Sequence, residues 1–459
     1  MRRCVHTVVA GTVLIAALVA PHAEDDDLPS RKAAIRLALR TAEFDQARLA
    51  AEQLKADAPA DAEAIALYGD ALWGSGLFDE AEQAYHDAAT RAPQFPRARY
   101  GAARALAMRS RLTDALDETL AALATAPDDW DVHALAGSIY ERLTRYDEAA
   151  QEYERYAALV PSEDPLPAQT ALSRAMFLRS FNGKAPLSMR PRDAAALFDA
   201  PFKLIKNKIV VQGRINGSRV DWVLDTGAER TGISLDTARR TGVRPVTSTL
   251  TAGVGVPRLR QVQLARIDTL EVGSLKIRHV PVSIRNPVIG GAPRWQGESL
   301  SPLALGLSAI VDYQRRQVTF GRTLPDQRGD VLLPMRFHRL AMVRGVLNAS
   351  HPAYFVVDTG GELISISTEM ADALNMHPVR RIPLRVFGLS GLDEGAFLLP
   401  GIDLDFDVIG YRKVGLAVLN LRAPSVLLGF KVGGIVGHKF LGQYRVTMDV
   451  ERSELRLER

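Results

Sequence analysis

Hydrophobic positions follow two different periods along the chain. Between residues 30 and 165 they form helical faces within a strict 34-residue repeat. Three sets of positions keep that spacing: Phe44, Phe78, Leu112 and Tyr146; Ala47, Ala81, Ala115 and Ala149; and Pro59, Pro93, Pro127 and Pro161. The pattern predicts four helix pairs, each closed by a proline, with a further helix over residues 168–181 that covers the open end.

A unit of this length, with a small residue between its helices and a proline after the second, resembles the tetratricopeptide repeat. The residues around Leu67, Gly69, Phe78 and Tyr85 match that pattern best. The resemblance implies a superhelix with a concave surface, because one helix pair cannot bury its own apolar face. Two interpretations remain open: a groove that docks a partner or substrate, and an appendage that stabilises the rest of the chain.

The pattern changes after residues 182–186 (NGKAP). From about Pro201 onward, apolar residues alternate in short runs bounded by Gly, Asn and Pro, which is typical of strands. The expected fold is therefore multidomain, with an all-α superhelix followed by a mainly β part. The expected boundaries are an export signal at 1–23, repeats at 30–165 with a capping helix to about 182, a linker at 183–200, and β lobes at 201–325 and 326–459.

The β part contains an internal duplication. Residues 225–246 (DTGAERTGISLDTARRTGVRPV) and 358–379 (DTGGELISISTEMADALNMHPV) agree at nine of 22 positions without gaps. Strand-forming runs precede both copies, at 209–217 and 219–224 in the first and at 342–348 and 353–357 in the second. Each half ends in a strand, an acidic turn and a strand, at 310–320 and 447–457.

Each copy begins with an Asp-Thr-Gly triplet, Asp225-Thr226-Gly227 and Asp358-Thr359-Gly360. One triplet is as consistent with a turn as with a site, whereas two at equivalent points of a duplicated block indicate a pair. Two close carboxylates cannot both ionise, so they share one proton and act as acid and base on a water. The glycines allow close backbone approach, and we expect each threonine to hydrogen-bond across to the opposite half.

Residues 201–459 resemble the retropepsin-like aspartic proteases. The resemblance rests on 224–228 (LDTGA), 357–361 (VDTGG) and 434–441 (GIVGHKFL). It implies that Asp225 and Asp358 are catalytic and that Ile435-Val436-Gly437 passes beneath the Asp loop. It also implies a Gly-rich hairpin from each half acting as a flap over substrate. The candidate flap tips are Gly253-Val254-Gly255 and Gly388-Leu389-Ser390-Gly391, for which an ordinary hairpin turn is the alternative.

The sequence departs from the family pattern at two places. The first half lacks a clear counterpart of Ile435-Val436-Gly437: gap-free alignment on Asp312 and Asp449 places 300–302 (LSP) opposite 437–439 (GHK), whereas a shifted alignment offers 304–306 (ALG). The gap-free version is favoured because the shift would shorten the following strand. Gly361 stands where the family more often has a small side chain.

The first residues have the pattern of a secretory signal. Arg2 and Arg3 precede an apolar run at 8–20, and cleavage is expected after Ala23. An uncleaved anchor is the alternative, although the run is shorter than the roughly 20 residues of a spanning helix. The only cysteine, Cys4, precedes the run, so the mature chain would have no disulfides, which fits a bacterial periplasm.

Composition narrows the function further. A hydrophobic content of 47% and a charged content of 24% describe a globular protein, and the net charge of +4 is spread without a basic patch, so nucleic acid is not an expected partner. The nine histidines form no zinc spacing, and neither a metal nor another cofactor is expected.

The expected function is an exported aspartic endopeptidase that acts on a polypeptide substrate and offers its repeats to a protein partner. No membrane contact is expected unless the signal stays uncleaved. The alternative is a catalytically weak or inactive protease-like binding module presented by the repeat scaffold.

Overall fold

The computed structural model describes residues 28–459 except 162–164, 191–192, 194, 256–257, 286–296, 327–328, 377–381 and 389. The expected export signal at 1–23 lies outside the described residues. Among the helices that are described, none combines the length and the apolar character needed to cross a membrane.

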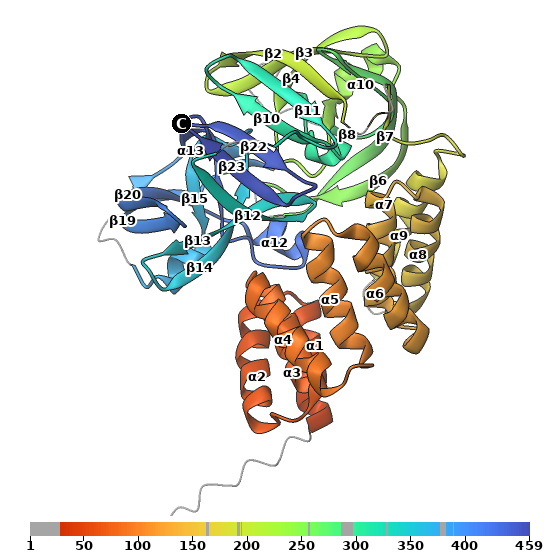
Figure 1. The fold of residues 1–459 in the computed structure, drawn as a ribbon, viewed down its shortest axis with the longest axis vertical. Helices are drawn as coiled ribbons and strands as arrows, with labels where there is room; N and C mark the ends of the chain where they lie inside the picture. Colours follow the sequence, from red (N-terminus) through yellow and green to blue (C-terminus); the bar gives the residue numbers. More distant parts are fainter. Residues whose placement is uncertain are drawn as a thin grey trace, which may run out of the picture.

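The N-terminal part is an array of antiparallel helix pairs (Figure 1). The second helix of every pair begins at a predicted large residue and ends two residues before the repeat's proline, which cannot continue the helical hydrogen bonds. The four predicted alanines are fully buried between helices. The 34-residue repeat is confirmed, with helices α1 (Leu28–Arg40), α2 (Phe44–Asp57), α3 (Ala62–Gly74), α4 (Phe78–Arg91), α5 (Pro96–Met108), α6 (Leu112–Thr125), α7 (Trp130–Arg142), α8 (Tyr146–Leu159) and α9 (Pro165–Arg179).

The β part consists of two lobes, and lobe 1 comes first in the chain. Its strands begin within residues 183–200, which were expected to form a linker. Leu197–Ile205 alternates exposed and buried side chains and pairs with later strands on both sides, so it is part of the lobe. Lobe 1 comprises β1 (Ser188–Met189), β2 (Leu197–Ile205), β3 (Lys208–Ile215), β4 (Ser218–Leu224), β5 (Gly232–Ser234), α10 (Leu235–Thr241), β6 (Pro245–Thr251), β7 (Arg260–Val272), β8 (Leu275–Arg285), β9 (Ser299–Leu300), η2 (Leu303–Leu305), β10 (Ser308–Asp312) and β11 (Gln317–Gly321).

Lobe 2 repeats this plan. Ser234 and Ser367, which are equivalent in the duplication, each cap the following helix by accepting the N–H of the residue three positions later at 3.1 Å. Lobe 2 comprises β12 (Val331–His338), β13 (Leu340–Leu347), β14 (His351–Val357), β15 (Ile364–Ser367), α11 (Thr368–Ala373), β16 (Ile382–Pro383), β17 (Val386–Gly388), β18 (Gly391–Asp393), β19 (Phe397–Phe406), β20 (Ile409–Leu419), α12 (Arg422–Leu428), β21 (Gly434–Val436), α13 (His438–Leu441), β22 (Arg445–Asp449) and β23 (Glu454–Glu458).

One antiparallel sheet joins the lobes. Its strands run in the order β2–β11–β10–β22–β23–β12, and the lobes meet where β10 pairs with β22. The order reads the same from either end, because each half contributes its last two strands and one early strand at the outer edge, β2 in lobe 1 and β12 in lobe 2. The predicted strand, acidic turn and strand at both chain halves are confirmed, and they form this shared sheet.

A shared apolar core joins the array to lobe 2. The ring of Phe78, at the start of α4, lies 4.8 Å from the ring of Tyr354 and 5.0 Å from that of Phe430, measured between centroids. The Asp79 carboxylate next to it accepts hydrogen bonds from the Tyr354 hydroxyl at 2.9 Å and from Arg344 at 3.0 Å. Because these contacts are apolar at the centre and ionic at the edge, the array is part of the folded core of lobe 2.

The far end of the array contacts lobe 1. Helix α9 packs beside β6 (Figure 1), and Arg266 on β7 donates to the carbonyl of Ser180 at 2.9 Å. Because the array also contacts lobe 2 through Phe78, it spans both lobes.

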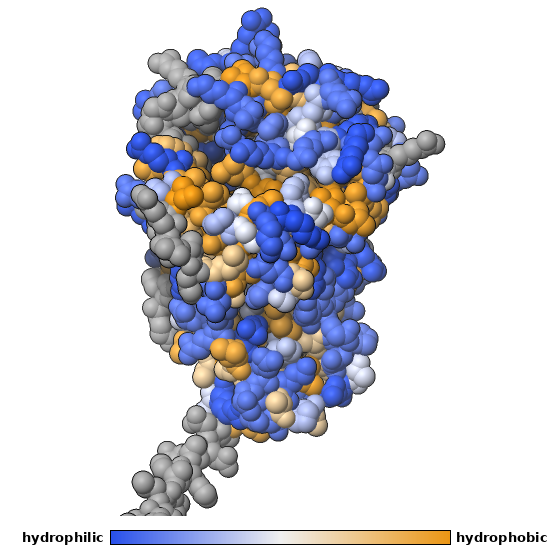
Figure 2. Space-filling view, turned by 90° about the vertical axis from the view of Figure 1, so that its left-hand side faces the viewer, coloured by the Kyte–Doolittle hydropathy of each residue, from blue (hydrophilic) through white to orange (hydrophobic). Residues whose placement is uncertain are grey.

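The surface of the repeats is mainly hydrophilic. They form the lower part of the face in Figure 2, and apolar residues gather in patches above them.

Candidate active site

The two aspartates stand at equivalent strand ends. Asp225 follows β4, which pairs in parallel with β9, and its N–H donates to the carbonyl of Leu300 at 2.9 Å. Asp358 follows β14, which pairs in parallel with β21, and its N–H donates to the carbonyl of Val436 at 3.0 Å. A parallel neighbouring strand therefore fixes the backbone of each aspartate, as a preorganised site requires.

This pairing identifies the counterpart of Ile435-Val436-Gly437 in lobe 1. Leu300 takes the place of Val436, and Ser301 takes that of Gly437, one residue away from the gap-free alignment. The alternative at 304–306 is wrong, because these residues belong to η2 and to the left-handed Gly306 that ends it. The short helix absorbs the one-residue difference, so no strand is shortened.

The element beneath the loop is tighter in lobe 2 than in lobe 1. A Cβ at Gly437 would lie 2.8 Å from the carbonyl oxygen of Gly361, so glycine is required there. Ser301 is fully buried, and its Oγ accepts the N–H of Ala304 at 3.4 Å. The serine thus bonds to a backbone N–H within η2, and the backbone of Asp225 keeps its hydrogen bond to Leu300.

The two threonines connect the triplets across the lobes. The Thr226 hydroxyl donates to the carbonyl of Val357 at 2.7 Å, and the Thr359 hydroxyl donates to that of Leu224 at 2.8 Å. Each hydroxyl also accepts the backbone N–H of the other threonine, at 3.0 and 3.2 Å. Both side chains are fully buried, and the predicted cross-lobe hydrogen bonds are present.

The carboxyls of Asp225 and Asp358 face each other across this junction. Burial, the charge of Asp358 and a hydrogen bond with its side chain raise the pKa of Asp225 to about 7, against the opposing effect of Arg285 and Lys208. The pair therefore binds one proton below that pH, and its two titrations belong to both groups together.

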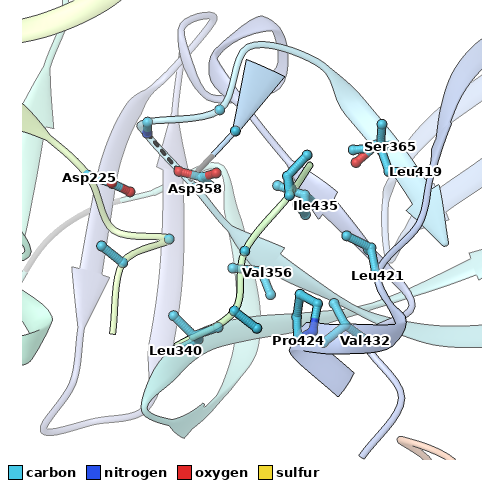
Figure 3. Close-up of a pocket in the computed structure, with 18 of the residues that line it drawn as sticks. Asp225, Leu340, Val356, Asp358, Ser365, Leu419, Leu421, Pro424, Val432 and Ile435 are labelled. Atoms are coloured by element: carbon cyan, nitrogen blue, oxygen red, sulfur yellow. Dashed lines mark hydrogen bonds between the residues drawn. The ribbon is translucent and has the colours of Figure 1, made fainter. Parts of the chain in front are cut away.

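The glycines leave room for this approach. A Cβ at Gly227 would lie 2.4 Å from Cγ of Asp358, and one at Gly360 would lie 2.7 Å from Oδ1 of Asp225. The N–H of Gly360 donates to Oδ1 of Asp358 at 2.7 Å, which is the bond dashed in Figure 3. A Cβ at Gly361 would also meet Oδ2 of Asp358 at 2.7 Å, so the departure at this position makes space for the carboxylate.

The pair opens into a cavity of about 510 Å³, a size typical of ligand sites. Figure 3 shows one wall, in which apolar side chains of lobe 2 lie beside Asp358; it includes Leu340, Val356, Leu421, Val432 and Ile435. Several of these side chains belong to the same apolar cluster as Phe78. The array thus packs behind a wall of the cavity.

The two candidate flap tips meet each other. The carbonyl of Val254 accepts the N–H of Ser390 at 2.9 Å, and the Cα of Gly255 lies so close to Gly391 that a Cβ would be 2.5 Å from its carbonyl oxygen. Gly253 and Gly388 line the cavity. The structure thus brings hairpins β6–β7 and β17–β18 together beside the dyad, with Leu389 outside the described residues.

Two cations beside the dyad were missed in the sequence. Lys208, at the start of β3, donates from Nζ to the carbonyl of Gly360, and Arg285, at the end of β8, donates to the hydroxyl of Ser299. Both lower the pKa of Asp225. No local motif marks them, because each reaches the site only through the strand pairing of its lobe. Over the described ranges, no three His, Cys, Asp or Glu side chains gather where a metal ion could bind.

Comparison with known families gives one match in the helical array and another in the β part. Residues 211–309 match the aspartyl protease family, and residues 67–128 and 120–164 match the tetratricopeptide repeat. The chain therefore has an N-terminal helical repeat region that matches tetratricopeptide repeats, followed by a mostly β region whose first lobe matches the aspartyl protease family. The matched protease residues include the first triplet, and the duplication relates the second triplet to it. No curated protein matches the chain.

Solved structures with similarity to part of this chain include the following three. One is a structure of PilF from Pseudomonas aeruginosa, with 14% identity, a TM-score of 0.28 and coverage of 34% of this chain and 70% of that chain. MamA has 20% identity, a TM-score of 0.25 and coverage of 33% and 84%. A thermophilic tetratricopeptide repeat protein of Thermus thermophilus has 19% identity, a TM-score of 0.29 and coverage of 34% and 84%.

Proposed function

We propose that this protein is an aspartic endopeptidase that hydrolyses peptide bonds with the dyad Asp225 and Asp358. One chain supplies both members of this dyad. The observation that carries the proposal is the pair of facing carboxyls, Asp225 and Asp358, at a junction that four threonine hydrogen bonds hold together. Burial and the facing Asp358 raise the pKa of Asp225, which supports it. Shifted pairs of this kind within a cleft are typical of catalytic carboxylates.

In the proposed mechanism, one water lies between the two carboxyls. The ionised member removes a proton from this water as its oxygen attacks the peptide carbonyl carbon, and the protonated member donates its proton to the carbonyl oxygen. The tetrahedral intermediate then collapses: the protonated member gives its proton to the leaving amine, the C–N bond breaks, and the ionised member takes a proton from one of the two hydroxyls. The pair again holds one proton. Lys208 and Arg285 act against protonation of the pair, because both lower the pKa of Asp225.

The test compares three variants in hydrolysis of an unfolded polypeptide from acidic to neutral pH. Asp225→Asn and Asp358→Asn should each lower kcat by at least roughly a thousandfold, because neither amide can take part in the proton exchange. Asp221→Asn is the matched control, since Asp221 is exposed on the strand that leads to Asp225. Cleavage that persists in both dyad variants would refute the mechanism.

The alternative function, a binding module with an inactive site, predicts a different outcome. It requires that the native protein leaves the polypeptide intact at every pH while still binding it. The intact loop support beneath both aspartates favours the peptidase, because neither departure from the family pattern displaces a carboxylate.

We also propose that the protein is exported to a bacterial periplasm after cleavage at Ala23, and that its repeats dock a protein partner. The apolar run at 8–20 supports export. The repeat family supports docking, whereas the core that the array shares with lobe 2 supports a stabilising role for it as well. Mass spectrometry of the purified mature N-terminus tests export. Site-specific cross-linking in cells from exposed positions on the repeats, such as Leu49, tests docking.

A further inference from the structure

The duplication assigns equivalent cavity positions to the two lobes. β5 pairs with β8 so that Ser234 lies opposite Arg285, and β15 pairs with β20 so that Ser367 lies opposite Leu419. Because Ser234 and Ser367 are equivalent helix caps, Arg285 of lobe 1 corresponds to Leu419 of lobe 2. Both side chains line the cavity.

Two further pairs follow the same rule. Lys208 corresponds to Leu340: β3 pairs with β4, and β13 with β14, in the same register relative to the following aspartate. Arg230 corresponds to Leu363, since each stands five residues after its aspartate. All four side chains line the cavity. At three symmetry-related positions around the dyad, lobe 1 therefore carries a cation where lobe 2 carries a leucine.

The three lobe 1 cations are only partly engaged by the protein: Lys208 bonds to the carbonyl of Gly360 and Arg285 to the hydroxyl of Ser299. The guanidinium of Arg285 lies over Gly232, where a Cβ would be 1.7 Å from it, whereas the equivalent residue in lobe 2 is Ser365. Arg230 donates no hydrogen bond to any described residue, and burial together with Arg174 and Arg339 lowers its pKa to about 10, so it stays charged at neutral pH.

The carboxylates around the cavity do not fully neutralise the three lobe 1 cations. Glu229 lines the cavity but binds Arg339, and Glu362 is exposed and accepts from Asn207. The buried Glu298 is bound by Ser234 and Thr237 and faces Arg285 from beyond the cavity lining. On the lobe 2 side, the one lining cation of the described residues is Arg385, exposed on its hairpin.

We propose, on the basis of the peptidase function above, that the site selects peptides with an acidic side chain on one side of the scissile bond and a bulky aliphatic one on the other. The pseudo-two-fold axis passes between the aspartates, so the residues flanking the bond lie over different lobes. Lys208, Arg230 and Arg285 receive the carboxylate over lobe 1. Leu340, Leu363 and Leu419 pack on the aliphatic side chain over lobe 2.

Binding tests the proposal without requiring hydrolysis. The probes are four short peptides in a common Ala-Gly frame, with Glu-Leu, Gln-Leu, Leu-Glu or Leu-Gln at the centre, titrated by calorimetry into the Asp225→Asn/Asp358→Asn double variant. One Glu peptide should bind about tenfold more tightly than its Gln partner, because a charge-assisted hydrogen bond is lost in the amide. Replacing Leu by Ala in that peptide should weaken binding by a similar factor.

The cations are tested in the same background. Arg230→Gln and Arg285→Gln should each reduce the Glu-over-Gln preference to near unity, while Lys276→Gln, an exposed cation on the same strand as Arg285, should retain it. Equal binding of the Glu and Gln peptides, a preference that survives both Arg variants, or no binding at all would overturn the proposal. Cleavage of the same peptides by the native protein is scored separately: hydrolysis without a Glu preference rejects the selectivity and leaves the peptidase function standing.

Discussion

The hydroxyl of Thr226 donates a 2.7 Å hydrogen bond to the carbonyl of Val357, the residue immediately before the second aspartate. The same oxygen accepts the N–H of Thr359 at 3.0 Å, so one side chain of lobe 1 satisfies two backbone groups of lobe 2. Because the junction excludes water, these bonds determine how closely the carboxyls approach.

Thr226→Val should lower the free energy of unfolding by roughly 2–4 kcal/mol, because the buried N–H and carbonyl lose their partner. Urea denaturation followed by tryptophan fluorescence measures this. Thr226→Ser, which keeps the hydroxyl, should lose less than about 1 kcal/mol. Equal destabilisation by Val and Ser would mean that packing of the methyl group, and not the hydrogen bonds, holds the junction.

Gly227→Ala should abolish most of the hydrolytic activity while leaving the fold in place. The added Cβ would overlap Cγ of Asp358 at 2.4 Å, so the opposite carboxylate must move. The control is Gly395→Ala, whose Cβ would make only an ordinary 3.5 Å contact with Asp393. Circular dichroism and kcat are measured together; full activity in Gly227→Ala would show that the carboxyls are farther apart than the structure places them.

The dyad should make both activity and stability depend on pH. Folding raises the pKa of Asp225 from about 4 to about 7, so the folded state holds a proton that the unfolded chain releases between these values. Its contribution to stability is complete below about pH 4 and is lost as the pH rises through about 7, by up to about 4 kcal/mol. Hydrolysis should decline over the upper part of the same range, as the shared proton is lost.

Asp225→Asn separates the dyad from other titrating groups. The amide does not ionise, so the variant should lack this fall in stability between pH 4 and 8, whereas Asp221→Asn should follow the native protein. The measurement is urea unfolding at several pH values. If native protein and Asp225→Asn respond to pH in parallel, the carboxyl of Asp225 is not held protonated by its surroundings.

Phe78→Ala should destabilise lobe 2 as well as the repeats. The Phe78 side chain is 2% exposed and packs on Tyr354 and Phe430, so its loss should lower the free energy of unfolding by about 3–5 kcal/mol. Leu49→Ala, at a site that is 61% exposed, should change it by less than about 0.5 kcal/mol. Hydrogen exchange reports where protection is lost. A loss confined to α1–α5, with β14 and α12 unaffected, would mean that array and lobe fold independently.

The helical repeats could be predicted from the sequence nearly to the residue. Their boundaries depend on local features, namely the 34-residue recurrence of buried alanines and the prolines that follow each second helix. The two aspartates could also be paired from the sequence, because duplicated segments fold alike and place Asp225 and Asp358 at equivalent strand ends. The strands that deliver them were predicted from alternation alone.

The counterpart of Ile435-Val436-Gly437 in lobe 1 could not be placed to the residue. Leu300 and Ser301 share no residue pattern with that element; only the parallel pairing of β9 with β4 identifies them. Of the three cations, Arg230 stands opposite Leu363 in the gap-free alignment and was open to recognition there. Lys208 and Arg285 were not, because their positions depend on strand register.

The sequence by itself therefore determined the repeats, the duplicated lobes and the pair of Asp-Thr-Gly triplets, since each follows from periodicity or from comparison of one segment with another. Only the tertiary structure decided that the triplets interlock through Thr226 and Thr359, that lobe 1 lines the cavity with cations, and that the array packs behind lobe 2. These three features arise from contacts between residues far apart in the chain, which depend on packing and on strand register. No local pattern specifies them.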